Sequence, residues 1–244
     1  MINLTLKNLK KKDDYLVLED GNIIVAFSTA ENGRSFNRNT KEGLNYLDGI
    51  REEFKVDNVA YLKQIHSDKI FIYNGQEAFN NNEGDAIITK KKNIAIGAFT
   101  ADCVPVIIIN KEKGVIGAVH SGWKGTISNI TKKTIEKMVE EFHISVEETK
   151  VYIGPHIRKC CYEISEELKE RFIEETGIRE SELFNKRNLS MEKVIEKDLL
   201  DIGLKEENIF SLNLCTYCED EVELYSYRKS DGAYGRLFTF AIIK

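Results

Sequence analysis

The densest group of buried-looking strands in this 244-residue chain lies between residues 86 and 120. Four short apolar segments follow one another there, over residues 86–89, 94–100, 104–109 and 114–120. Apolar runs of this length are typical of buried strands. The longest apolar stretch is interrupted by Thr100, Asp102 and Pro105, so it falls short of the roughly 20 apolar residues of a membrane-spanning helix. These segments predict a sheet core.

Further strands and several helices are predicted on both sides of this group. An acidic residue followed by glycine in the turn at 19–22 predicts a hairpin between strands 16–19 and 22–28. Apolar residues three and four positions apart predict a helix over 41–54. The same patterns predict strands at 59–62, 69–73, 151–155, 209–212 and 238–243, and helices at 127–142, 166–175 and 191–202. The chain is therefore expected to form one integrated α/β domain.

Three potential metal ligands lie where predicted strands end. His66 follows strand 59–62, Cys103 precedes strand 104–109, and His120 ends strand 114–120. Two imidazoles and a thiolate suit Zn²⁺, and three protein ligands leave one tetrahedral position open, as in catalytic zinc sites. Such a Zn²⁺ lowers the pKa of bound water to about 7. Taken singly, each residue is more often a small core cysteine or a hydrogen-bonded turn histidine.

Charge and composition argue against several classes of protein. The formal net charge is −5, with acidic and basic residues interspersed, which gives no support for binding nucleic acid or a membrane surface. The N-terminal segment lacks the apolar run of a signal peptide. Five cysteines, an odd number, without an export signal argue against a disulfide framework. We expect a cytoplasmic protein.

Four of the cysteines stand apart from the three potential ligands. Cys160 and Cys161 are a vicinal pair, and Cys215 and Cys218 form a CxxC motif. In principle four thiols make a structural zinc site, but a single CxxC is a weak indication. A redox CxxC normally opens a helix, and none is predicted after Cys218. The default interpretation is that these are small buried residues.

Short motifs in a fixed order cover nearly the whole chain. They are FST at 27–29, KQIHS at 63–67, GDAI at 84–87, TADCVP at 100–105, HSGWKG at 120–125, YIGP at 152–155, CCYE at 160–163, CTY at 215–217, and YSYR at 225–228 with GR at 235–236. In these motifs the chain resembles the laccase-domain family, also called the multicopper polyphenol oxidase or purine nucleoside phosphorylase family. Bacterial members are also described as peptidoglycan editing factors.

The resemblance implies a single laccase-type α/β domain over residues 1–244, with a mixed β-sheet flanked by helices and a metal site on loops at strand ends. It places the ligands at His66, Cys103 and His120, with zinc or copper as the metal. It implies phosphorolysis of adenosine, inosine, guanosine and methylthioadenosine, and hydrolytic deamination of adenosine. The partners implied are purine nucleosides and phosphate.

Two positions depart from the pattern of the family. Relatives often have arginine directly after FST, where this chain has Ala30, and Arg34 is the candidate to supply the missing cation. The basic residue after tryptophan is commonly arginine and is Lys124 here. Lysine cannot form the bidentate fork of a guanidinium to phosphate, so anion affinity is expected to differ from that of relatives.

Two aspartates are candidates for orienting a ligating imidazole or for moving protons. Asp102 directly precedes Cys103, and Asp85 lies in the GDAI motif. The alternative is that Asp102 caps a turn and Asp85 is a solvated loop residue, and we favour function for Asp102 over Asp85.

Several further residues are candidates for binding substrate. Lys124 and the backbone N–H groups of residues 121–126 suit an anion such as phosphate at a helix start, although an ordinary capped turn has the same pattern. Arg228 and Arg236 suit phosphate recognition or are solvated surface arginines. Trp123 and Tyr217 would stack on a purine or pack in the core.

The leading hypothesis is a zinc-dependent purine nucleoside phosphorylase with adenosine deaminase activity. Its catalytic residues would be Cys103, Asp102 and His120, and its substrate- or phosphate-binding residues Lys124, Arg34, Arg228 and Arg236. A copper polyphenol oxidase is disfavoured because the chain has four histidines, too few for several coppers. Two further alternatives remain: a hydrolase editing peptidoglycan precursors, with Cys103 as nucleophile and His120 as base, and a non-catalytic metal-binding partner protein.

Overall fold

Strands that are buried along their whole length form the centre of the protein. The computed structural model describes residues 1–230 and 235–244. Every residue is buried in β8 (Ile94–Thr100), β9 (Val104–Asn110), β10 (Val115–Ser121) and β15 (Leu237–Ile243). Successive side chains of a strand point to opposite faces, so a strand buried throughout must be covered on both faces.

The strands divide between two large mixed sheets. The seven-stranded sheet has the order β1 (Ile2–Leu4), β14 (Ile209–Leu212), β11 (Thr149–Ile153), β9, β10, β7 (Ala86–Thr89) and β6 (Ile70–Ile72). The six-stranded sheet has the order β2 (Lys10–Lys12), β3 (Tyr15–Asp20), β4 (Ile23–Ser28), β15, β8 and β5 (Asn58–Ala60). Both sheets contain parallel and antiparallel pairs.

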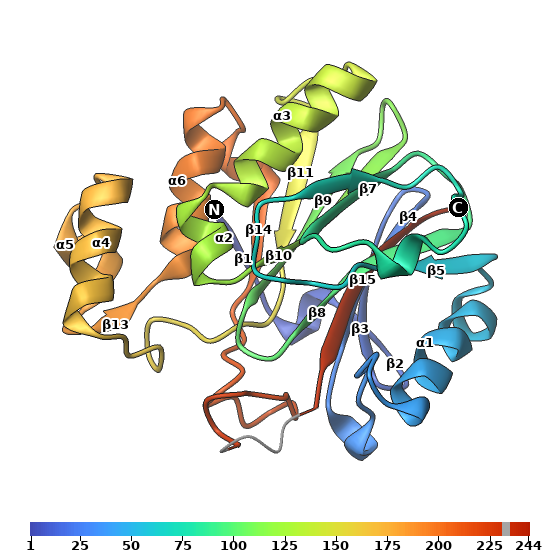
Figure 1. Cartoon of the computed structure of the whole chain (residues 1–244), viewed down its shortest axis with the longest axis horizontal. Helices are drawn as coiled ribbons and strands as arrows, with labels where there is room; N and C mark the ends of the chain where they lie inside the picture. The colour runs from blue at the N-terminus through green and yellow to red at the C-terminus, as the bar shows by residue number, and fades with distance from the viewer. Residues whose placement is uncertain (231–234) are drawn as a thin grey trace.

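Three hydrophobic clusters show that the protein has four layers (Figure 1). Phe27 of β4 and Ile107 of β9 belong to the cluster between the two sheets. The outer face of the six-stranded sheet packs against Leu47 and Ile50 of α1 (Lys41–Phe54). The outer face of the seven-stranded sheet is covered by the remaining large helices: α2 (Trp123–Ile127), α3 (Ile130–Phe142), α4 (Glu166–Thr176) and α6 (Met191–Asp201).

The predicted helix over 127–142 is wrong in one respect. Ile127 is the last residue of α2, and α3 begins at Ile130 after a break at Ser128 and Asn129. The backbone of Asn129 has a φ of 57°, a left-handed conformation that asparagine tolerates and that ends a helix. The apolar 3–4 spacing continues across this break, so the pattern conceals it. The short elements that the sequence did not indicate are β1, η1 (Leu6–Asn8), β2, η2 (Glu31–Gly33), η3 (Phe79–Asn81), α5 (Glu180–Leu183), β12 (Phe184–Asn185), β13 (Asn188–Leu189) and η4 (Glu206–Asn208).

Two of the connections that pass from one sheet to the other carry candidate metal ligands. The first joins β5 of the six-stranded sheet to β6 of the seven-stranded sheet and carries His66. The second joins β8 to β9 and carries Cys103. His120 pairs with Pro105 at the start of β9, so it lies beside the second connection. Within the described part of the chain, helices are too short or too polar to cross a membrane.

Candidate metal centre

His66, Cys103 and His120 converge although they come from three separate segments. One ligand atom from each lies within 4.8 Å of the other two. The Sγ atom of Cys103 is 3.8 Å from Nε2 of His66, and the two imidazole rings meet edge to face with centroids 4.9 Å apart. His120 is buried, Cys103 is half-buried and His66 is exposed, so the trio is open on the His66 side.

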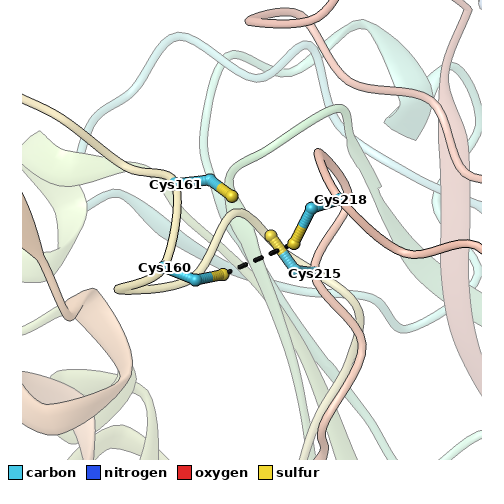
Figure 2. A group of neighbouring side chains, drawn as sticks. All are labelled: Cys160, Cys161, Cys215 and Cys218. Carbon is cyan, nitrogen blue, oxygen red and sulfur yellow. Dashed lines mark hydrogen bonds between the residues drawn. The ribbon is translucent and has the colours of Figure 1, made fainter.

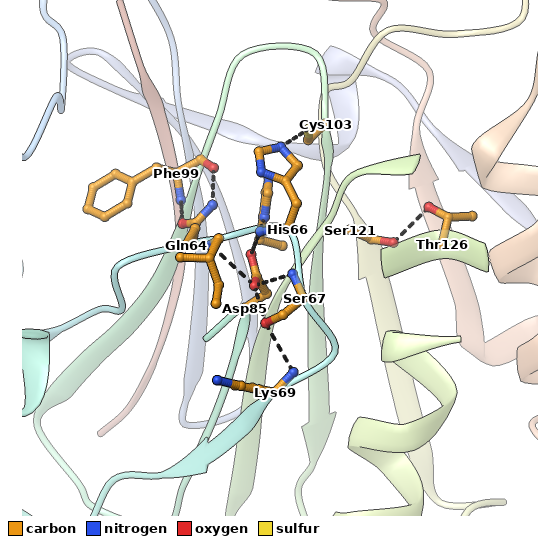
Figure 3. A network of polar contacts seen from close by, with 11 residues as sticks. Gln64, His66, Ser67, Lys69, Asp85, Phe99, Cys103, Ser121 and Thr126 are labelled. Carbon is orange, nitrogen blue, oxygen red and sulfur yellow. Dashed lines mark hydrogen bonds and ion pairs between the residues drawn. The ribbon is translucent and has the colours of Figure 1, made fainter. Parts of the chain in front are cut away.

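Asp85 organises two of these three residues (Figure 3). Its Oδ1 accepts a hydrogen bond from Nδ1 of His120 at 2.8 Å and one from the backbone N–H of His66 at 3.1 Å. Its Oδ2 accepts from the backbone N–H groups of Ile65 and Ser67 and from the Ser67 hydroxyl. One buried carboxylate thus fixes both the orientation of His120 and the loop that carries His66.

The Gln64 side chain holds the same loop against β8 (Figure 3). Its amide nitrogen donates to the carbonyl of Phe99 at 2.8 Å, and its oxygen accepts from the N–H of Phe99 at 2.7 Å. This is the hydrogen-bond pattern of a strand residue, supplied by a side chain. The loop needs such support because His66 adopts a φ of 57°, which is unfavourable for a residue with a β-carbon.

At the candidate metal centre, charge interactions and hydrogen bonds outweigh burial in setting the pKa values of the side chains. Burial disfavours the thiolate of Cys103, but the His120 and His66 imidazoles lower the pKa of the thiol to about 6. Burial also disfavours a charged His120, yet Cys103 and Asp85 raise its pKa to about 9. For Asp85, burial opposes ionisation, and hydrogen bonds from His120 and Ser67 lower the carboxyl pKa below its usual range. Cys103 therefore favours its thiolate form, which is the form that ligates metals.

Gly122 leaves room for the trio. A β-carbon at this position would lie 2.8 Å from Cδ2 of His66 and 3.1 Å from Sγ of Cys103. At these distances the His66 and Cys103 side chains would have to shift, so glycine permits the close approach of the two ligands.

Asp102 anchors the Cys103 connection to distant parts of the chain. Its Oδ1 accepts a hydrogen bond from the Thr216 hydroxyl, and its Oδ2 accepts one from the backbone N–H of Arg228, both at 2.7 Å. Its carbonyl accepts from the N–H of Ile157. Asp102 is 8% exposed and has a φ of 91°, so these contacts hold the residue before Cys103 in an unusual backbone conformation.

Two cavities meet at the trio. One, of about 330 Å³, contains Cys103 and has aromatic walls from Trp123, Tyr162 and Tyr227 together with Arg228. The other, of about 350 Å³, contains His120 and is lined by polar and cationic residues: Asn37, Arg38, Asn39, Lys63 and Gln64. His66 and Arg236 line both.

The structure separates the predicted substrate residues into two groups. Arg228 and Arg236 line the cavities beside the trio, and the Arg228 guanidinium also donates to the carbonyl of Glu163. Lys124 is exposed, with its ammonium 5.5 Å from the centroid of the Trp123 ring. Arg34 pairs with Glu53 at 2.7 Å.

Arg34 lies among the rings of Tyr15, Phe36 and Tyr46, so its contacts are those of a structural residue. Of the described residues beside the trio, Arg38 and Lys63 are cations that the sequence analysis did not place in the site, and Lys63 was named only as part of a motif. For Arg38 the sequence offers no such motif, and its position in an unremarkable loop gives no sequence signal. Of the two predicted stacking residues, Trp123 lines the aromatic cavity, whereas Tyr217 is a surface residue with 38% of its side chain exposed.

The donor set fits a tetrahedral metal. With Zn–S near 2.3 Å and Zn–N near 2.0–2.1 Å, a nitrogen and a sulfur ligand lie about 3.6 Å apart. The distance of 3.8 Å between Cys103 and His66 is close to this value. Nδ1 of His120 is engaged by Asp85, which leaves Nε2 as its ligand atom, the arrangement of a carboxylate–histidine–metal relay. These residues could therefore hold one metal ion.

The sequence of the chain is similar to those of known proteins. Residues 27–244 match the family model described as multi-copper polyphenol oxidoreductase laccase. A purine nucleoside phosphorylase of Clostridium acetobutylicum is 46% identical over 240 residues, covering 97% of this chain and 100% of that protein. The adenosine deaminase RL5 of an unknown prokaryotic organism is 25% identical over 246 residues, covering 88% of this chain and 92% of that protein.

Solved structures share the fold. The hypothetical protein YfiH of Bacillus licheniformis superimposes with a TM-score of 0.87 at 22% identity, covering 96% of this chain and 98% of that one. YlmD of Geobacillus stearothermophilus superimposes with a TM-score of 0.86 at 20% identity, covering 97% and 99%. From the match of its sequence over residues 27–244, the chain belongs to the multi-copper polyphenol oxidoreductase laccase family.

Proposed function

We propose that the protein is a zinc-dependent purine nucleoside phosphorylase with adenosine deaminase activity. One observation carries the proposal: the metal-ligand trio lies where an aromatic cavity meets a cationic one. A nucleoside has an aromatic base and a polar sugar, and its phosphorolysis requires a bound anion beside the sugar. The names of the relatives support the same class of reaction.

The aromatic cavity is the proposed nucleoside site. A purine fits against the rings of Trp123, Tyr162 and Tyr227, where stacking contributes about 0.5–1.5 kcal/mol per ring pair. The Arg228 side chain closes the cavity on the side of Tyr162, with its guanidinium 5.6 Å from that ring.

The cationic cavity is the proposed phosphate site. Arg38, Lys63 and Arg236 line it, and guanidinium groups bind phosphate oxygens in a bidentate manner. Arg38 is already positioned, because its guanidinium donates to the carbonyl of Asn80 and lies against the ring of Tyr61. Lys124 and Arg34 remain sequence predictions and have no part in this arrangement.

Phosphorolysis and deamination use the same site in different ways. Phosphate adds to C1′ of the sugar, the bond from C1′ to the purine nitrogen breaks, and the base leaves with a proton. In deamination, water adds at C6 and ammonia leaves. A metal held by His66, Cys103 and His120 would supply Lewis acidity at its open position. Asp85 keeps His120 oriented, and Asp102 keeps Cys103 in place.

Product analysis of metal-quantified protein tests the proposal. The protein is incubated with adenosine, with and without phosphate, beside Cys103→Ala. Adenine and ribose 1-phosphate that form only with phosphate, and are lost together with one zinc in the variant, are the expected result. Inosine formed without phosphate would establish the deaminase activity. Zinc-loaded protein that converts no purine nucleoside would refute the proposal.

One contact favours a second candidate, a cysteine hydrolase. Nε2 of His66 is 3.8 Å from Sγ of Cys103, so an imidazole stands beside a potential nucleophile. Alkylation of Cys103 in protein stripped of metal distinguishes the two candidates. A hydrolase would be active before alkylation and inactive after it, whereas the phosphorylase would already be inactive once the metal is removed.

A further inference from the structure

Four cysteines that the candidate metal centre does not use form a second group of soft ligands (Figure 2). This four-cysteine cluster contains Cys160 and Cys161 from the segment after β11 and Cys215 and Cys218 from the segment after β14. All four Sγ atoms lie within 4.8 Å of one another. The Sγ atoms of Cys160 and Cys218 are 3.6 Å apart. Four sulfurs around Zn²⁺ at about 2.3 Å would lie about 3.8 Å from each other, so the cluster has the size of a tetrathiolate site.

The backbone brings the two segments together independently of the sulfurs. His156 and Cys215 form a parallel bridge, in which the N–H of Thr216 donates to the carbonyl of His156 at 3.1 Å. The carbonyl of Arg158 accepts from the N–H groups of Cys161 and Tyr162 at 2.9 Å and closes a tight turn around Cys160. The cysteines are therefore presented by rigid turns rather than by mobile chain.

A backbone donor from one segment points at a sulfur of the other. Sγ of Cys215 accepts a hydrogen bond from the N–H of Arg158 at 3.5 Å. A thiol sulfur is a weak acceptor, whereas a metal-bound thiolate carries negative charge that an N–H donor stabilises. The segment after β11 thus already contacts a sulfur of the segment after β14 through its backbone.

The burial of the cluster argues against the expectation of small core residues. Cys160 and Cys218 are exposed and Cys161 is half-buried; only Cys215 is buried. The 3.6 Å separation between Cys160 and Cys218 is longer than the roughly 2.05 Å of a disulfide, and all five cysteines of the chain are free thiols. Four thiols whose sulfur atoms lie this close together match the ligand preference of a thiophilic divalent ion.

We propose that the four-cysteine cluster is a second metal site, a closed structural Zn²⁺ site with four thiolate ligands. The proposal stands on these four residues and does not depend on the proposed nucleoside chemistry. The site joins the segment after β11 to the segment after β14. Thr216, the neighbour of Cys215, donates to Asp102, and Ile157 donates to the carbonyl of the same residue. The second metal therefore holds the support on which the Cys103 connection rests.

Metal counting on protein purified under reducing conditions tests the proposal. The wild-type chain is expected to hold two zinc ions, and Cys103→Ala and the double variant Cys160→Ser with Cys218→Ser one each. Cobalt substitution locates the remaining ion. Cys103→Ala should keep the sulfur-to-cobalt charge-transfer bands of a tetrathiolate site, and the double variant should lose them while its first site still binds cobalt.

The opposite results would overturn the proposal. They are a Cys103→Ala variant without bound zinc, thiols at all four positions that react rapidly with a thiol reagent in zinc-loaded protein, or a mass two units low from a disulfide. If the double variant does not fold, the wild-type protein and Cys103→Ala decide alone, because Cys103→Ala without bound zinc excludes a second site. Activity is measured separately: inactive wild-type protein with two zinc ions would refute the proposed function and leave this proposal standing.

Discussion

Asp85 and His120 are joined by a 2.8 Å hydrogen bond between Oδ1 and Nδ1, in a place where they are 2% and 4% exposed. The same carboxylate accepts hydrogen bonds from the backbone N–H groups of residues 65–67. Asp85 is not one of the three candidate ligands, yet it determines where two of them, His66 and His120, lie.

Replacing Asp85 by asparagine should therefore weaken metal binding. The amide has one acceptor oxygen in place of two and brings an N–H₂ group against donors, so His120 and the His66 loop lose their common support. We expect zinc affinity to fall about 10–100-fold, as for other residues that orient metal ligands. Competition with a chromophoric chelator measures this. Asp68→Asn is the matched control, because Asp68 pairs with Lys133 on the exposed side of the same loop. Equal affinity in the two variants would contradict the relay.

Replacing Gly122 by alanine should remove the metal without unfolding the protein. The new methyl group would press on His66 and Cys103, which can move outward because the trio is open on the His66 side. We expect at least a tenfold loss of zinc affinity and a Tm within a few degrees of wild type. Gly49→Ala in α1 is the control: its β-carbon would meet its nearest neighbour at 3.8 Å, and alanine should raise stability by up to about 1 kcal/mol. Unchanged zinc affinity in Gly122→Ala would show that the ligands are further apart in solution.

Thr216→Val tests whether Asp102 positions Cys103 or transfers protons. Valine keeps the volume of threonine but removes the hydroxyl that donates to Oδ1 of Asp102. If Asp102 acts by position, Thr216→Val and Asp102→Asn should both lower kcat several-fold with the same pH profile as wild type. A profile that loses one limb only in Asp102→Asn would identify Asp102 as the proton-transferring group.

Arg236→Ala should raise the KM for phosphate more than that for the nucleoside. Arg236 lines both cavities, and Arg38, which lines only the cationic one, should affect phosphate alone. Loss of a charged hydrogen bond to phosphate corresponds to about 1.5–3 kcal/mol, or roughly 10–100-fold in KM. Lys124→Ala provides the comparison, since its side chain is exposed. A comparable rise in Lys124→Ala would place the anion at the start of α2, as the sequence alone predicts.

Asp198→Asn should stabilise the protein above pH 6. Burial raises the pKa of the Asp198 carboxyl to about 6, despite the opposing effect of Lys132 and Lys197. In the unfolded chain the pKa is about 3.9, so between pH 4 and 6 the folded state holds a proton that the unfolded state has lost. The wild-type free energy of unfolding therefore falls across this range and stays lower above it.

The Asp198→Asn substitution removes this dependence of the free energy of unfolding on pH. The gain in the free energy of unfolding should be near zero at pH 4 and about 1 kcal/mol at pH 7.5, because solvent reaches part of the carboxyl. Urea denaturation at the two pH values measures it, with Asp201→Asn, an exposed residue of the same helix, as control. An equal gain at both values would contradict the assignment to ionisation.

Local patterns in the sequence predicted the elements well. The bounds of α1, β7, β8 and β14 agree with prediction, because uninterrupted apolar runs and 3–4 spacing report burial directly. The sequence could not show that the strands divide between two sheets. β15 lies between β4 and β8, far from both in the chain, and strand pairing over such distances leaves no local pattern.

The candidate site was predicted unevenly for the same reason. The resemblance indicated the three ligands, and the structure brings them together. Asp85 was ranked below Asp102 because a loop aspartate is usually solvated, and only the folded chain shows it buried under His66 and beside His120. From the sequence a four-thiol zinc site was only a weak possibility, because the bridge that brings its two halves together joins residues that are distant in the chain.

Two of the crossings between the sheets carry metal ligands, and this has a mechanical consequence. Since His66 and Cys103 ride on connections that span the sandwich, while His120 is fixed to a single sheet, sliding of one sheet over the other would pull the trio apart. The distances between the three ligands thus depend on how the two sheets are aligned. Mild denaturant should abolish turnover before circular dichroism changes, and a bound metal should oppose the sliding because it ties both connections to His120 of β10.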